Sequence, residues 1–125
     1  MGISITTVFD DDDFPNQYGD FREIVEPDGF PDQKARSLGL KSIMEFVDFS
    51  EDWDMDYVSA EVGIAAASKL IEAFKPLDAS EFVEERFQRI AEQTKAEIIE
   101  DLELLVRILK PAKEAGVKFK FVQMW

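Results

Sequence analysis

The sequence contains neither cysteine nor histidine. Without cysteine the chain has no disulfide framework, no thiolate nucleophile and no Cys-based zinc or iron–sulfur site. Without histidine it has no Ser–His–Asp triad, no imidazole base that titrates near neutral pH and no His-ligated metal. Carboxylates, Lys, Arg, Tyr, Ser and Thr are the side chains left for catalysis, and they form no recognisable catalytic motif. We therefore expect a protein that is not an enzyme and that needs no cofactor.

Basic residues are also scarce, with 14 Lys and Arg against 27 Asp and Glu, which gives a formal net charge of −13. Nucleic acid is not expected as a partner, because phosphates require a basic surface. The same charge opposes docking on an anionic membrane. No apolar run approaches the ~20 residues that span a bilayer, and the N-terminus lacks the pattern of a signal peptide. These absences predict a cytoplasmic location.

The chain does contain enough apolar residues for one core. Its 125 residues are 46% hydrophobic and 12% aromatic, which predicts a single folded domain over 1–125 and not a disordered acidic tail. Residues 1–58 carry 15 acidic and 4 basic side chains, whereas residues 59–125 carry 12 and 10. The first part is an acidic strand and loop half, and the second is a helical half that ends in a strand. This asymmetry predicts one localised acidic face.

Segments at both ends of the chain alternate as half-buried strands do. Ile3–Phe9 is rich in β-branched residues, and Val117–Trp125 is the second segment. One face of the latter carries Val117, Phe119, Phe121 and Trp125. Lys118 and Lys120 predict that its other face is at least partly exposed to water at one end. Residues 38–49 fit a helical stripe, but 43–49 also fit a short strand, which their β-forming side chains favour.

Two helices are expected in the second half. Ser59 is a good N-cap and Pro76 stops a helix, so the first lies between them. Its predicted buried stripe is Val62, Ala65, Ala66, Leu70 and Phe74. The second runs from Asp78 or Ser80 to about Lys110, and its stop signals are Pro111 and Gly116. Its predicted buried face is Phe82, Val83, Phe87, Ile90, Ala91, Ile98, Leu102, Leu105 and Leu109. The elements predict an α+β fold: a small, mostly antiparallel sheet that includes the N- and C-terminal strands, packed against two or three helices.

Two carboxylate clusters of the acidic half are candidate cation sites. Residues 52–56 place Asp at positions 1, 3 and 5 as an EF-hand loop does, but Tyr57 and Gly63 stand where that loop needs Gly and Glu. Asp10–Asp13 follow a strand, and further acids such as Asp48 or Asp52 would have to complete a Mg²⁺ site there. A carboxylate-based divalent-cation-binding protein or metal-dependent hydrolase is therefore an alternative function, with no metal ligand assigned.

Aromatic residues are interleaved with these acids, which favours an interaction surface. Aromatic side chains anchor protein interfaces, and acids around them steer a basic partner. We predict a non-enzymatic protein that binds a basic protein, such as a nuclease whose cationic site holds phosphate. The residues predicted to bind this partner are Asp10, Asp11, Asp12, Asp13, Glu51, Asp52, Trp53, Asp54, Asp56 and Tyr57. The aliphatic stretch Ile98–Leu109 leaves a structural or regulatory homodimer as a further alternative, so both monomer and homodimer stay open.

Several short motifs follow the same order as in one family of small α+β proteins. A Met-Gly start leads into the strand Ile3–Phe9 and the acidic turn Asp10–Asp13. A mid-chain apolar strand leads to Glu51-Asp52-Trp53, just before the capped helix start Ser59-Ala60-Glu61. The C-terminal helix and strand carry Ala112, Glu114, Gly116, Phe121 and Gln123. In this order the chain resembles small bacterial immunity proteins of polymorphic toxin systems. The resemblance implies that the protein binds and neutralises a toxin by occlusion, and it carries over no catalytic residue.

Overall fold

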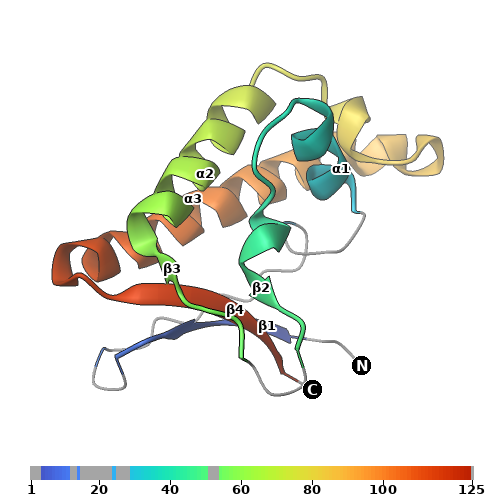
Figure 1. Cartoon of the computed structure of the whole chain (residues 1–125). Coiled ribbons are helices and arrows are strands. Elements are labelled where there is room, and N and C mark those ends of the chain that lie inside the picture. Colours follow the sequence, from blue (N-terminus) through green and yellow to red (C-terminus); the bar gives the residue numbers. More distant parts are fainter. Residues whose placement is uncertain (1–3, 12–13, 15–23, 25–28, 51–53, 125) are drawn as a thin grey trace.

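Helices lie on one face of a small sheet in this protein (Figure 1). The structure is a computed structural model, and it describes residues 4–11, 14, 24, 29–50 and 54–124. The long helices are α2 (Ala60–Phe74) and α3 (Ala91–Ala115), which pack against each other. The predicted α+β class, with the N- and C-terminal strands in one sheet, is confirmed.

The sheet is built around the C-terminal strand β4 (Lys118–Met124). The strand β1 (Ser4–Phe9) runs antiparallel along one edge of β4, with Phe9 opposite Phe119. Two very short strands share the other edge. The strand β3 (Val58–Ser59) is antiparallel and faces residues 118–119, whereas β2 (Val47–Asp48) is parallel and faces residues 121–122. Two of the three pairings are therefore antiparallel, as the predicted sheet required.

The ambiguous segment 43–49 is helical at its start and extended at its end. Ile43–Phe46 forms a 3₁₀ helix, η1, and only Val47–Asp48 is a strand. Ser42 caps η1, because its hydroxyl accepts from the backbone N–H of Met44 at 3.2 Å and its own N–H donates to the Glu45 carboxylate at 3.2 Å. This capping box explains why the strand prediction was wrong for the first four residues of the segment.

The helix α2 begins after Ser59 and ends before Pro76, as predicted. Its buried face is rotated from the predicted stripe: Val62 is 41% exposed and Ala65 is also exposed, whereas Gly63 is buried. The remaining buried residues are Ala60, Ala66, Ala67, Leu70 and Phe74. The small residues Ala and Gly therefore face the core and let α2 approach its neighbours closely.

The second predicted helix was wrong at its start, and its predicted end near Lys110 was too early, although the stop signal at Gly116 was correct. Residues 79–90 form two 3₁₀ segments, η2 (Ala79–Phe82) and η3 (Glu85–Ile90), before α3 begins at Ala91. Phe87 has non-helical backbone angles, and Phe87 and Ile90, both predicted to be buried, are each 42% exposed. At the other end α3 continues through Pro111 to Ala115. Gly116 then ends it with a left-handed φ of 71°, as glycine favours.

The short helix α1 (Phe30–Ser37) is attached to the rest by polar contacts. Its buried Asp32 accepts a hydrogen bond from the Ser42 hydroxyl, next to η1. Lys34 forms an ion pair with Glu81 of η2 at 2.8 Å. These contacts link α1 to the start of η1 and to η2.

The core lies between α2, α3 and the helix-facing side of β4. Its fully buried side chains include Phe74, Phe82, Ile98, Leu102, Leu105, Leu109, Phe119 and Phe121. Phe119 packs its ring against both Phe46 and Phe121, with centroids 5.5 Å apart in each pair. None of the described helices has the length and apolar character needed to cross a membrane.

Candidate functional site

The predicted partner-binding residues lie on two sides of the sheet. Asp10 and Asp11 are exposed at the end of β1, and Asp10 accepts a hydrogen bond from the Lys118 N–H at 2.9 Å. Asp54 and Asp56 are exposed in the segment between β2 and β3, on the other edge of β4. The other predicted residues, Asp12, Asp13, Glu51, Asp52 and Trp53, lie outside the described part of the chain. The described acids thus form two separate groups, with β4 between them.

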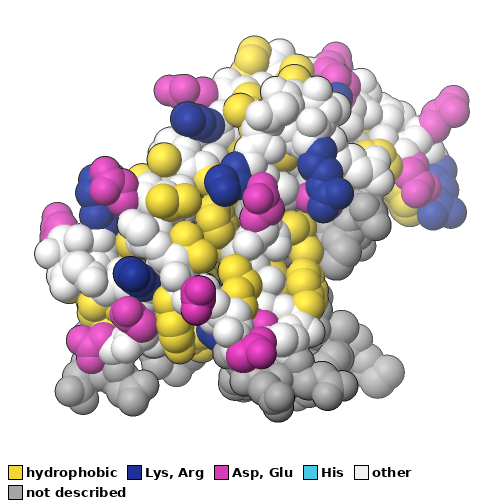
Figure 2. All heavy atoms as spheres, viewed as in Figure 1, with side chains coloured by type: hydrophobic (Ala, Val, Ile, Leu, Met, Phe, Trp, Pro, Cys, Tyr) yellow, Lys and Arg dark blue, Asp and Glu magenta, His cyan; other side chains and the backbone are white. Residues whose placement is uncertain are grey.

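The group on the β2–β3 side is accompanied by exposed aromatic rings. Tyr57 is 37% exposed and Phe49 is 53% exposed. Figure 2 shows Asp and Glu side chains along the lower part of this face, beside exposed hydrophobic ones. We call Phe49, Asp54, Asp56 and Tyr57 the loop face. Phe49 was not predicted to be part of the site, because in the sequence it reads as the last residue of an apolar run.

Beneath the loop face lies a buried ion pair. Lys120 Nζ of β4 is 2.8 Å from Asp48 Oδ2 of β2, and the two side chains are 3% and 1% exposed. Both residues lie on the sheet face opposite the helices, since Lys120 alternates with Phe119 and Phe121 and Asp48 pairs with Val122. The prediction that this face of the last strand is at least partly wet at one end is confirmed at Lys118, which is exposed, whereas Lys120 is buried.

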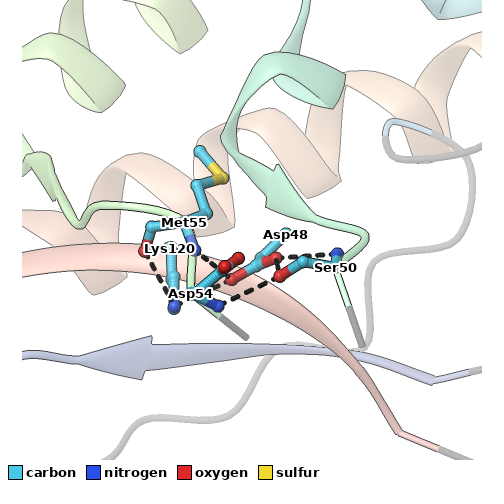
Figure 3. A network of polar contacts seen from close by, with 5 residues as sticks. All are labelled: Asp48, Ser50, Asp54, Met55 and Lys120. Atoms are coloured by element: carbon cyan, nitrogen blue, oxygen red, sulfur yellow. Dashed lines mark hydrogen bonds and ion pairs between the residues drawn. The ribbon is translucent and has the colours of Figure 1, made fainter. Parts of the chain in front are cut away.

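The Asp48 carboxylate connects this pair to the segment that follows β2 (Figure 3). Its Oδ1 accepts from both the backbone N–H and the hydroxyl of Ser50, the former at 2.9 Å. Its Oδ2 accepts from the Met55 N–H at 3.0 Å as well as from Lys120. Lys120 Nζ also donates to the Met55 carbonyl at 2.9 Å, and the Ser50 hydroxyl accepts from the Asp54 N–H at 3.0 Å. Both ends of the 50–55 segment are therefore fixed to one buried charge pair.

These contacts determine the charge state of Asp48. Burial by itself would raise the pKa of the carboxyl, because it penalises the charged form. The hydrogen bonds from Lys120, Ser50 and the Met55 backbone outweigh that effect and hold the pKa of Asp48 well below its usual range. The carboxylate is therefore ionised at neutral pH, and its charge is balanced by Lys120.

Tyr57 joins the buried pair to the surface. Its ring lies over Lys120 Nζ, with 4.8 Å between the nitrogen and the ring centroid. A cation at this distance from an aromatic face is attracted by the ring quadrupole. Tyr57 precedes β3 directly, so the position of its exposed ring depends on both β3 and Lys120.

The alternative sites gain no support from this geometry. The Asp48 carboxylate, considered above as a spare metal ligand, is surrounded by donors from Lys120, Ser50 and Met55. Within the described part of the chain, no three acidic residues converge where a metal ion would sit. The aliphatic residues of 98–109 that suggested a dimer, such as Ile98, Leu102 and Leu105, are buried in the core of this single chain.

Comparison with known proteins adds no relative: no family model, no curated protein and no solved structure matches this chain.

Proposed function

We propose that this protein binds a basic protein through the loop face and acts by occlusion, as an immunity-type inhibitor of a toxin. The observation that carries the proposal is the loop face itself. Two exposed carboxylates and two exposed aromatic rings stand next to backbone groups of Ser50 and Met55 that are hydrogen-bonded to a buried ion pair. No step of this function requires a reaction at the site.

The side chains of the loop face suit recognition of a cationic surface. Tyr57 and Phe49 supply the large apolar area that anchors protein interfaces, and Tyr57 adds a hydroxyl. Asp54 and Asp56 attract a basic partner and raise the rate of encounter. Because the backbone at Ser50 and Met55 is held by Asp48 and Lys120, less conformational entropy is lost there when a partner docks.

The class of partner follows from charge and from the sequence resemblance. The acidic half carries a net charge of −11 from its 15 acidic and 4 basic side chains. A toxin domain that acts on nucleic acid has a cationic site for phosphate, and carboxylates can occupy such a site in place of phosphate. The order of short motifs that resembles immunity proteins favours this class of basic partner over others.

The test takes its partner from the genes beside the one that encodes this chain, where the proposal predicts a toxin domain. Purified toxin domain and inhibitor are mixed in a stopped-flow instrument at about 20 mM and about 500 mM salt, where screening lengths differ several-fold. We expect the association rate to fall at least ~10-fold at the higher salt, and the toxin activity to be lost in the complex. An association rate that does not depend on salt concentration, or a toxin that stays active when bound, would contradict the proposal.

A further inference from the structure

We propose that the Asp48–Lys120 pair is a clasp that sets the conformation of the loop face, and that Lys120 is a positioning residue for Tyr57. The clasp consists of Asp48, Ser50, Met55 and Lys120. The geometry of the clasp stands alone, whereas its role in partner binding rests on the function proposed above.

Packing of the core does not explain why the charges of Asp48 and Lys120 are buried. Removing two charges from water costs more than packing two apolar residues of similar size, so a buried pair is weak evidence for stability. The neighbouring position on the same face of β4 is Val122, which is fully buried and apolar. This face of the sheet therefore accepts apolar side chains, and core formation does not require a Lys at position 120.

The Asp48–Lys120 pair contacts backbone groups next to β2 and β3. Asp48 accepts from backbone N–H groups of Ser50 and Met55, and Lys120 donates to the Met55 carbonyl. The Ser50 hydroxyl in turn accepts a hydrogen bond from the Asp54 N–H. The polar atoms of the pair are thus used to satisfy backbone groups of Ser50 and Met55.

The strands β2 and β3 by themselves provide few contacts to the sheet. β2 and β3 have two residues each, and both pair only with β4 among the described strands. Strands of this length contribute few ladder hydrogen bonds. They also run in opposite senses relative to β4, so the chain between them must reverse direction. The clasp supplies further contacts at the described residues Ser50, Asp54 and Met55.

The clasp also positions the aromatic part of the loop face. The Lys120 ammonium that closes the pair with Asp48 also lies 4.8 Å from the centre of the Tyr57 ring. If Lys120 loses its partner or its charge, the ring loses a contact on its inner side. The exposed face of Tyr57 and the backbone of Asp54 are therefore expected to change together.

The experiment compares amide hydrogen exchange in the full chain and in the double variant Asp48→Leu/Lys120→Met. The double variant removes both charges, whereas Lys120→Met alone would leave Asp48 buried and unpaired. Lys118→Met is the matched control, because Lys118 lies on the same strand but is exposed. Protection of the Met55 amide should fall at least ~10-fold in the double variant, while protection of Leu105 and Phe121 in the core changes less than about 3-fold. The control variant should leave all three unchanged.

Two outcomes would overturn the proposal. One is unchanged protection of Met55 in the double variant; the other is an equal loss at Met55, Leu105 and Phe121, which would make the pair a general stabiliser. A second measurement needs no variant: in the unaltered protein at low urea, the amides of Ser50, Asp54 and Met55 should open with one common free energy. If these three amides open with different free energies, the clasp is also rejected.

Neither measurement uses a partner, so the two proposals can fail separately. A toxin domain that does not bind would refute the proposed function and leave the exchange result intact. If the hydrogen-exchange protection of Met55 does not depend on Asp48 and Lys120, the clasp is refuted, and binding by the loop face is unaffected.

Discussion

The Phe119 ring occupies the space that a side chain at position 63 would need. A Cβ built on Gly63 would lie 2.6 Å from both Cε1 and Cζ of Phe119, and 2.7 Å from Leu109 Cδ1. Because both neighbours are fully buried, they have little room to move. Glycine at this position lets α2 approach β4 and α3 more closely than any other residue would.

Gly63→Ala is therefore expected to destabilise the protein. Overpacking of a tight core commonly costs ~1–3 kcal/mol, which outweighs the gain of up to ~1 kcal/mol from replacing glycine within a helix. The free energy of unfolding from urea titration measures the net effect. Phe119→Leu, alone and combined with Gly63→Ala, is the control, since the double variant should lose less than the sum of the two single changes. An unchanged or raised stability of Gly63→Ala would contradict the close approach.

Thr7 is a position where a substitution should raise stability. It lies opposite Phe121 on β1 and is 1% exposed, and within the described structure its hydroxyl oxygen has no hydrogen-bond partner. A buried hydroxyl without a partner costs ~1–3 kcal/mol in proteins. Thr7→Val keeps the shape of the side chain, so we expect it to raise the free energy of unfolding by about 1 kcal/mol.

The matched control for Thr7 is Thr6→Val. Thr6 pairs with Val122 on the other face of β1 and is only half-buried, so its change should stay within ~0.5 kcal/mol. A Thr7→Val protein less stable than the Thr6→Val protein would mean that the Thr7 hydroxyl has a partner after all. Thermal or urea unfolding of both variants decides the question.

The depressed pKa of Asp48 makes stability depend on pH in the acidic range. Burial raises this pKa, but the hydrogen bonds from Lys120, Ser50 and Met55 hold it below the value of about 3.9 expected in the unfolded chain. The stabilisation is therefore fully present above about pH 4–5 and is lost as pH falls from there through the folded pKa. Urea titrations between about pH 2.5 and pH 7 should show this loss in the unaltered protein.

The control for this pH dependence is the double variant Asp48→Leu/Lys120→Met. The pKa of Asp78 is lowered by hydrogen bonds from Ser80, and that of Glu81 by its bond from Lys34. Both groups are the same in the two proteins, so their contributions cancel in the comparison. The difference in unfolding free energy between the unaltered protein and the double variant should shift against the unaltered protein below about pH 4. A difference that is constant with pH would show that Asp48 does not titrate as inferred.

Local patterns in the sequence were sufficient for much of the fold. Alternation predicted the terminal strands, and Ser59, Pro76 and Gly116 marked helix ends that the structure confirms. The α-helix predicted over residues 79–90 was wrong, because the hydrophobic spacing there also fits 3₁₀ turns and the backbone of Phe87 leaves the helical region. The two-residue strand β3 was missed, because two residues carry no period that could be recognised.

The site was harder to predict, because its central contact is not local. Asp54, Asp56 and Tyr57 were identified from composition, and the structure places them at or near the surface. Asp48 and Lys120 are 72 residues apart, and only the parallel register of β2 with β4 brings them together. A lysine between two phenylalanines in an alternating strand indicates a wet face, and nothing in the local pattern indicates a buried partner.

The loop face makes a kinetic prediction that separates its acids from its aromatic anchor. Asp54→Asn/Asp56→Asn removes two exposed charges and should slow association with a basic partner ~3–10-fold at low salt, with little change in dissociation. Tyr57→Ala removes a large side chain and should speed dissociation ~10-fold or more, with little change in association. Glu100→Gln on the exposed side of α3 is the charge control and should alter neither rate. If the two variants changed the same rate constant, or if Glu100→Gln slowed association equally, the basic partner would be attracted by overall charge and would not dock on the loop face.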